Sequence, residues 1–318
     1  MRPWTLWRYR TALPAPLDDD SGWEQRVSLG EGGTPVLPLD ADGRTWLKVE
    51  SMNPTGSFKD RGAAVLIATA LAAGASRVVV DSSGNAGAAA AAYCARVGLP
   101  CEVYVPASAS PGKSAQIAAY GAVLHRVEGT REDVAAAARQ AVASTGAFHA
   151  SHVDQPAFTA GVATMAIELW EQMDPLPPEV VVPVGNGSLL LGLASGFAHL
   201  ADAGLIPEVP RLIGVQAAAC SPVAAAWSGH DPATGVHGPT IAEGIAIAQP
   251  RRLSEIVATA AEMITVTDDQ ITAARADLAH HGLWAEPTAA VAYAGSKTRP
   301  PTPRIVVLTG HGLKSPVP

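Results

Sequence analysis

Short apolar runs and longer Ala-rich stretches alternate along the chain after residue 60. The short runs are rich in Val and Ile, which is typical of buried strands, and the longer stretches have the length of helices. Strands are predicted near residues 78–81, 101–105, 123–127, 180–184, 212–216, 264–266 and 305–309. Helices are predicted over residues 86–97, 114–120, 131–144, 160–172, 189–203, 269–281 and 288–295. This alternation predicts an α/β protein with parallel sheets and helical crossovers.

Length and composition narrow the class of protein. A chain of 318 residues with 48% hydrophobic and 16% charged residues predicts a compact enzyme-like protein of two lobes. A net charge of -7, without clustered arginines, argues against a nucleic-acid partner. No stretch reaches the roughly 20 apolar residues that a membrane span needs, and the first twenty residues lack the apolar core of a signal peptide.

The three cysteines, Cys94, Cys101 and Cys220, form no CxxC pair. Because the number of cysteines is odd and their spacing matches no known motif of this kind, the sequence argues against a disulfide framework and against a zinc site. We therefore predict a cytoplasmic protein. No metal site is predicted from these residues.

Lys59 is one of only five lysines, and it stands in the run from Asn53 to Gly62, at the start of the apolar stretch 63–73. Turn residues before it predict that its amine is held near a helix start. A desolvated lysine near partial positive charge has a lowered pKa, and its neutral amine attacks aldehydes such as pyridoxal phosphate. The alternative is an ordinary surface lysine. The other loops decide between the two.

A second loop, Asp81 to Gly87, reads Asp-Ser-Ser-Gly-Asn-Ala-Gly between a predicted strand and an Ala-rich helix. Backbone N–H groups and small hydroxyls at a helix start suit a carboxylate or a phosphate. Helix capping alone would require fewer such residues. We expect this loop to bind an anionic group of a ligand.

Two further glycine-containing loops follow strands. Residues 184–188 (Val-Gly-Asn-Gly-Ser) open an apolar helix, where glycine lets the backbone approach a phosphate near the helix dipole. A dinucleotide fingerprint starting at Gly185 would need glycine where Leu190 stands, so a nicotinamide dehydrogenase is disfavoured. The nucleotide P-loop and the GxSxG nucleophile elbow are also missing from the sequence. In residues 308–314, a hydroxyl beside two glycines is compatible with a contact to a ring nitrogen of an aromatic cofactor. Taken alone, this segment is more typical of an ordinary Gly-rich strand end.

Together these motifs resemble the fold-type-II pyridoxal-phosphate enzymes, most of all the threonine synthase family. The segments 29–35, 214–218 and 286–288 are similar to the same family. The resemblance implies a two-lobed α/β fold like that of the tryptophan synthase β subunit, with the cofactor in the interlobe cleft. It implies a large cofactor-binding lobe of residues 1–66 and 158–318, a small mobile substrate-binding lobe of residues 67–157, and a homodimer.

The resemblance also implies residue roles. Lys59 would join the cofactor as a Schiff base and later move protons, and a neutral hydroxyl at the pyridine nitrogen would favour elimination over transamination. The other implied cofactor contacts are Phe58, Asn85, Gly185, Asn186, Gly187, Ser188, Leu189 and Thr309. The implied docking residues for the carboxylate of a small amino-acid substrate are Ser82, Ser83, Gly84, Ala86 and Gly87.

One segment departs from the family. Where threonine synthases carry Asn-Pro-x-Arg-x-x-Gly-Gln to hold the phosphate of phosphohomoserine, residues 155–162 read Gln-Pro-Ala-Phe-Thr-Ala-Gly-Val. Phe158 replaces the arginine, which removes charge-assisted hydrogen bonds of about 1.5 to 3 kcal/mol each. We therefore predict a threonine-synthase-like lyase that acts by elimination or replacement at an amino-acid side chain, with a substrate other than phosphohomoserine.

Several alternatives stay open at this point. A serine or threonine dehydratase, or a β-replacement synthase, would use the same Lys59 and Asn85. A cofactor-binding protein without catalysis is a remote alternative. His149, His152 and Asp154 lack a fourth partner for a metal ion, so His152 is interpreted as a substrate-side residue or as part of a solvated loop.

Overall fold

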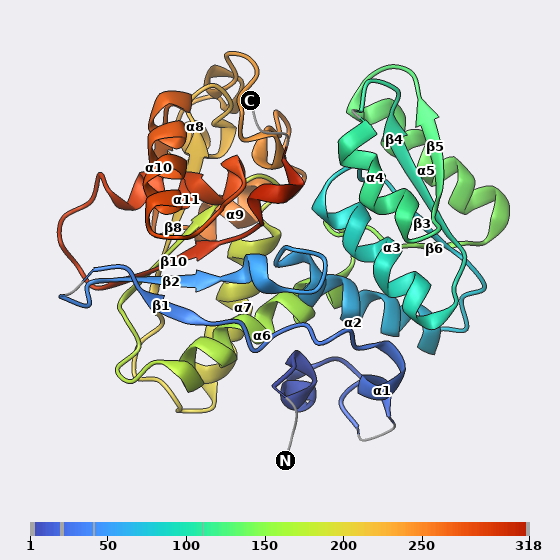
Figure 1. Cartoon of the computed structure of the whole chain (residues 1–318), viewed down its shortest axis with the longest axis horizontal. Coiled ribbons are helices and arrows are strands. Elements are labelled where there is room, and N and C mark those ends of the chain that lie inside the picture. Colours follow the sequence, from blue (N-terminus) through green and yellow to red (C-terminus); the bar gives the residue numbers. More distant parts are fainter. Residues whose placement is uncertain (1–3, 20–21, 41, 110, 316–318) are drawn as a thin grey trace. The chain divides into compact units, whose positions relative to one another are not determined.

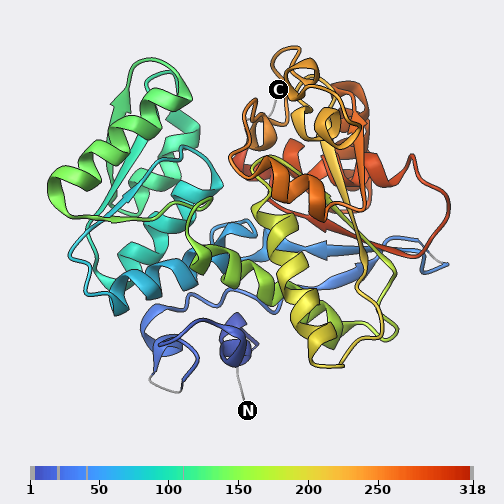
Figure 2. The same cartoon turned by 180° about the vertical axis from the view of Figure 1, so that it is seen from behind.

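The structure is a computed structural model that describes residues 4–19, 22–40, 42–109 and 111–315, with backbone only for residues 111–113. The described chain packs as two compact units, each with its own sheet (Figures 1 and 2). Unit 1 comprises residues 4–33 and 53–161, and unit 2 comprises residues 34–52 and 162–315. The lobe boundaries that the resemblance implies, at residues 67 and 157, stay a prediction.

Unit 2 is built on a six-stranded sheet with the order β1-β2-β10-β7-β8-β9. β1 pairs antiparallel with β2 at one edge, and the other neighbours are parallel. All five residues of β7 and of β10 are buried, as expected for strands covered on both faces. The strands are β1 (Val36–Pro38), β2 (Thr45–Val49), β7 (Glu179–Pro183), β8 (Arg211–Ala217), β9 (Glu262–Val266) and β10 (Arg304–Leu308).

Helices cover both faces of this sheet. The buried face of α11 packs with Leu47, Val181 and Val306 into one apolar core, which α10 extends (Figure 1). α7 covers the other face (Figure 2). The helices are α7 (Ser188–Asp202), α8 (Pro222–Trp227), α9 (Leu253–Thr259), α10 (Asp268–His280) and α11 (Pro287–Ser296). Short 3₁₀ helices are η2 (Glu50–Met52), η3 (Pro232–Gly235), η4 (Glu243–Ile245) and η5 (Gly312–Lys314).

Unit 1 is built on a four-stranded parallel sheet with the order β5-β4-β3-β6. α2 and α3 lie side by side next to this sheet, because their small buried alanines let two helices approach closely (Figure 1). The strands are β3 (Val78–Val80), β4 (Cys101–Pro106), β5 (Val123–Val127) and β6 (Phe148–His149). The helices are η1 (Leu6–Ala12), α1 (Trp23–Val27), α2 (Lys59–Ala72), α3 (Asn85–Val97), α4 (Pro111–Ala119) and α5 (Arg131–Thr145), and α6 (Pro156–Gln172) begins here and continues in unit 2.

The strands and helices predicted from the sequence are confirmed, and β5 has the predicted bounds. The sequence did not predict β6, α8 and α9, because two to seven residues are too short to display a period. No helix in the described part of the chain combines the length and the apolar character needed to cross a membrane. Among those residues there is also no group of three or more His, Cys, Asp or Glu that could hold a metal ion.

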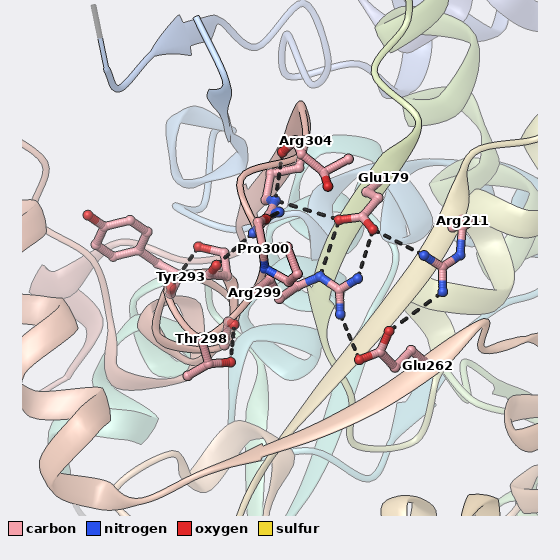
Figure 3. A network of polar contacts seen from close by, with 11 residues as sticks. Glu179, Arg211, Glu262, Tyr293, Thr298, Arg299, Pro300 and Arg304 are labelled. Carbon is pink, nitrogen blue, oxygen red and sulfur yellow. Dashed lines mark hydrogen bonds and ion pairs between the residues drawn. The ribbon is translucent and has the colours of Figure 1, made fainter. Parts of the chain in front are cut away.

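Charged side chains gather at the amino ends of the parallel strands of unit 2 (Figure 3). Glu179, Arg211 and Glu262 belong to β7, β8 and β9, and parallel neighbours that begin at one edge bring such residues together. Arg299, from the loop after α11, lies 2.7 Å from both Glu179 and Glu262. Glu179 is nearly fully buried, so its cationic partners compensate the cost of removing it from water. This edge is opposite the one where the predicted cofactor loops begin, so we assign the network to stability.

Glu179→Gln is expected to lower the free energy of unfolding by about 1.5 to 3 kcal/mol, because charge-assisted bonds to buried arginines are lost. Glu262→Gln is the matched control, since the Glu262 side chain is 34% exposed and exposed ion pairs contribute about 0 to 1 kcal/mol. Urea unfolding of both variants measures the difference. Equal effects in the two variants would contradict a special role for the buried carboxylate.

Candidate active site

Lys59 is the first residue of α2, as the sequence predicted. The turn before it uses Gly56 at a φ of 85°, a left-handed conformation that favours glycine. The Thr55 hydroxyl donates to Asp60 Oδ2 at 3.0 Å, and the Thr55 backbone N–H donates to the same atom at 3.1 Å. Asp60 is fully buried, so these bonds fix the turn to the first helical residues. The lysine therefore projects from a rigid helix start.

Two aromatic rings lie beside the Lys59 amine. Its Nζ is 4.5 Å from the ring centroid of Phe58 and 5.4 Å from that of Phe158, the third residue of α6. The Phe158 ring packs directly on Gly62, where a Cβ would overlap it. Lys59 Nζ, beside two aromatic faces, is partly shielded from water. Lys48 is fully buried with its Nζ bonded to Glu168, and Lys297 is half-exposed and pairs with Asp277. Among these three lysines, Lys59 has the environment expected of a nucleophile.

The Ser82–Gly87 loop follows β3 and ends in the first turn of α3. Ala86 and Gly87 are buried, and a Cβ on Gly87 would overlap the backbone carbonyl oxygen of Ser82. By contrast, a Cβ on Gly84 would meet nothing within 4 Å. The first turn of α3 has no acidic residue and no side-chain cap. Its backbone N–H groups are thus suited to an anion such as a carboxylate.

Two histidines and an aspartate lie next to this loop in unit 1. His149 Nε2 is 3.7 Å from Asp81 Oδ1, an ion-pair distance, because β6 pairs with β3. Burial raises the pKa of Asp81, but the polar contact with His149 and the nearby His152 outweigh it, and the pKa is lowered overall. Burial, followed by the charge of Lys59, lowers the pKa of His152 to about 3. His152 is therefore neutral near pH 7.

In unit 2, the loop 184–188 connects β7 to α7. Gly187 caps α7 with a φ of 77° and supplies no side chain, so the first N–H groups of this helix have no side-chain cap. A Cβ on Gly185 would lie 3.0 Å from Ile245 Cα, and one on Gly187 would overlap the Ile256 side chain. Gln216 Nε2 donates to the Val184 carbonyl at 3.1 Å. These contacts hold the loop as a backbone cradle for an anion.

Thr309 follows β10, which is a parallel neighbour of β7. Thr309 and the loop 184–188 therefore lie at the same edge of the sheet, at the carboxyl ends of adjacent strands. The Thr309 hydroxyl is buried, and it has no hydrogen-bond partner among the described residues. A buried hydroxyl without a protein partner is suited to hydrogen-bond a polar group of a ligand.

Glu286 is a residue to which the sequence analysis assigned no role. A Cβ on Gly310 would overlap its carboxylate, and its backbone N–H donates to the Gly310 carbonyl at 3.0 Å. An isolated bridge between Ala285 and His311 brings these segments together. The Glu-Pro-Thr segment at 286–288 was visible in the sequence, but no local pattern indicates that it lies beside Gly310. The pairing that brings the two segments together is non-local.

A model of the family described as "Pyridoxal-phosphate dependent enzyme" matches residues 27–310. The chain belongs to this family. The resemblance stated from the sequence motifs is thereby confirmed, and the cofactor of the family is pyridoxal phosphate. A threonine synthase of Methanosarcina acetivorans is 32% identical to this chain, and the match covers 98% of this chain and 80% of the length of that synthase.

Solved structures agree on the fold-type-II architecture. A threonine deaminase from T.th. has a TM-score of 0.74 and 27% identity, covering 85% of this chain and 88% of that one. A serine racemase from Dictyostelium discoideum has a TM-score of 0.77 and 24% identity, covering 91% of this chain and 95% of that one, and supports the fold alone. The family therefore fixes the fold and the cofactor, whereas the related proteins carry out different reactions.

The residues of this chain fit pyridoxal phosphate. In unit 2, an uncapped helix start with a glycine cradle suits the phosphate, and the Thr309 hydroxyl without a partner suits the ring nitrogen. In unit 1, Lys59 supplies an amine for the aldehyde. The individual contacts of Phe58, Asn85 and residues 185–189 stay predictions, as do those of the substrate loop.

Thr309→Val is expected to leave the unfolding free energy of the cofactor-free protein almost unchanged, because the hydroxyl gives up no internal hydrogen bond. Cofactor affinity is expected to fall by about 2- to 12-fold, the equivalent of one neutral hydrogen bond of about 0.5 to 1.5 kcal/mol. Equilibrium dialysis and urea unfolding measure the two quantities. A large loss of stability with unchanged affinity would assign the hydroxyl to the core instead.

Proposed function

We propose that this protein is a lyase that eliminates or replaces a group on the side chain of a small amino acid whose side chain is uncharged. Phosphohomoserine is therefore not its substrate. The observation that carries the proposal is that Phe158 is fully buried beside Lys59. The sequence resemblance implies that Phe158 stands where threonine synthases have the arginine of their phosphate clamp. Its ring offers an apolar wall instead of a bidentate cation. Such a wall favours an uncharged side chain.

The bound cofactor supplies an electron sink for negative charge at the substrate Cα. Lys59 is the base that removes and returns the Cα proton, since its Nζ projects from a rigid helix start. The N–H groups of residues 82–87 orient the substrate carboxylate. Thr309 offers the ring nitrogen a neutral hydroxyl, which does not enforce a protonated ring and so favours elimination.

Two types of enzyme would carry out this reaction: a serine or threonine dehydratase, and a β-replacement synthase. The threonine deaminase similarity at 27% identity supports the first. We further propose a homodimer in the cytoplasm, on the basis of the family resemblance and of three cysteines that form no CxxC pair.

The experiment is a panel of amino acids, with and without phosphate esters, mixed with the purified protein and followed by absorbance and by mass spectrometry of the products. Serine or threonine is expected to give a keto acid, and a product that forms only with an added thiol or amine would identify a synthase. Phosphohomoserine is expected to react at least about 100-fold less efficiently, because two charge-assisted bonds of about 1.5 to 3 kcal/mol each are missing. Comparable turnover of phosphohomoserine to threonine would contradict the proposal, and spectral change without any product would favour a non-catalytic binding protein.

A further inference from the structure

His152 is a polar residue beside the reactive lysine, and the function proposed above does not use it. It lies between β6 and α6, and its ring meets Phe158 edge-on, with the two centroids 6.0 Å apart. The same Phe158 ring is 5.4 Å from Lys59 Nζ. All three residues belong to unit 1. His152 and Lys59 therefore contact one aromatic wall.

The Nδ1 atom of His152 is buried and has no hydrogen-bond partner among the residues that the structure describes. A buried polar atom left without a partner typically costs about 1 to 3 kcal/mol, so it requires an explanation in a native protein. Ser57 Oγ and Ser114 Oγ are buried hydroxyls of the same unit that also lack a partner. The helix of Ser114 reaches the lysine loop, because Gln116 Nε2 donates to the Thr55 carbonyl at 3.0 Å. Unit 1 therefore contains, besides Lys59, buried hydroxyls that are able to hydrogen-bond a ligand.

The loop that carries His152 is held in place by its own hydrogen bonds. The Ser151 hydroxyl donates to Asp154 Oδ2 at 2.9 Å and accepts from the Asp154 backbone N–H at 3.2 Å. Gln155 Nε2 donates to the His149 carbonyl at 3.0 Å. These bonds use the neighbours of His152, and the Nδ1 atom of its ring has no hydrogen-bond partner within the described part of the chain. The loop therefore presents the imidazole in a fixed position.

Burial, followed by the positive charge of Lys59, lowers the pKa of His152 and keeps this imidazole neutral. In a neutral imidazole, Nδ1 either carries the N–H and donates or is the acceptor, and a hydroxyl group can pair with it in either tautomer because a hydroxyl both donates and accepts. The neutral imidazole provides no positive charge for a phosphate ester. The titratable groups that act on His152 are Lys59, Asp81, Arg131 and His149.

We propose that His152 determines substrate specificity by hydrogen-bonding the side-chain hydroxyl of a β-hydroxy amino acid, with Phe158 as the apolar wall beside it. The inference rests on the proposed function and narrows its substrate to the serine and threonine class. It also explains why an aromatic residue and a neutral histidine occur together where a phosphate clamp is missing. The role is one of binding and orientation, and Lys59 remains the base.

Serine and alanine, which differ only by the hydroxyl, test this role in the enzyme with its cofactor. His152→Leu is expected to lower kcat/KM for serine by about 10- to 100-fold, the equivalent of leaving a buried hydrogen-bonding group unpaired. Exchange of the alanine Cα proton with deuterium, followed by NMR, is expected to stay within about 2-fold of the wild-type rate. His152→Asn keeps a neutral hydrogen-bonding group and is expected to recover most of the serine activity. An equal loss for serine and alanine, or no loss for either, would overturn the proposal.

Two further measurements keep the test independent of how well each variant folds. His125→Leu is the control, because His125 belongs to the same unit and its ring stacks on Tyr104, with the centroids 4.5 Å apart. This substitution is expected to leave the rates of both the serine and the alanine reaction unchanged. In the wild-type protein, the His152 ring signal, assigned by its loss in His152→Asn, is expected to shift with serine and not with alanine. A wild-type enzyme that acts on other amino acids but ignores serine and threonine would overturn this inference alone. Absence of any product from every amino acid would remove the proposed function itself.

Discussion

Lys59→Ala is expected to abolish turnover, with a loss of at least about 1,000-fold in kcat. The substitution removes both the amine that joins the cofactor aldehyde and the base that moves the Cα proton, and a general base alone contributes about 10²- to 10⁴-fold. The absorbance that the bound cofactor gains through this amine is expected to disappear as well. Steady-state kinetics and an absorbance spectrum measure the two effects.

Lys297→Ala is the matched control for this substitution. Lys297 is half-exposed and pairs with Asp277 at 2.6 Å, and it directly follows α11, which carries no predicted cofactor contact. Its loss should leave both the spectrum and kcat unchanged. Retained turnover in Lys59→Ala would show that another residue is the base.

Gly87→Ala is expected to lower kcat/KM by about 100-fold or more. A Cβ at this position would overlap the backbone carbonyl oxygen of Ser82, which cannot move aside as a flexible side chain would. The loop must therefore shift, and misplacement of a substrate-binding group by about 1 Å can cost 10²-fold. The loss should fall mainly on KM for the amino acid, because this loop is proposed to hold the carboxylate.

Gly84→Ala provides the same chemical change in the same loop without the clash. Nothing lies within 4 Å of a Cβ on Gly84, and its φ of -102° is allowed for alanine. The kcat/KM of Gly84→Ala is expected to stay within about 3-fold of the wild-type value, because substitutions that create no clash at the surface usually have small effects. A Gly84→Ala defect as large as that of Gly87→Ala would mean that loop flexibility, rather than its shape, supports binding.

The sequence predicted most of the secondary structure because each element carried a local signal. Val-rich runs such as those of β7 and β10 are buried along their whole length, and the turn residues before Lys59 mark a helix start that the structure places at that residue. The glycine loops were visible for the same reason, and close backbone approaches at Gly87 and Gly185 leave little room for a Cβ. Family motifs then supplied the fold and the cofactor.

The surroundings of the lysine could not be predicted in this way. Phe158 packs on Gly62, and His149 faces Asp81, through contacts between segments far apart in the sequence. The pairing of β6 with β3 that brings the histidines close involves only two residues of β6, too few to show a pattern. His152 consequently allowed several interpretations in the sequence. In the structure its Nδ1 atom is buried and its ring contacts Phe158 edge-on, and its substrate-side role stays a proposal.

The central claim is that Lys59 carries the cofactor, and chemical trapping tests it most directly. The purified holoenzyme is treated with borohydride, which makes the link between amine and cofactor permanent, and is then digested and analysed by mass spectrometry. The peptide that contains Lys59 is expected to carry the added mass of the reduced cofactor, while peptides with Lys48 and Lys297 remain unmodified. An unmodified Lys59 peptide, with the cofactor mass on another lysine or on none, would contradict the account.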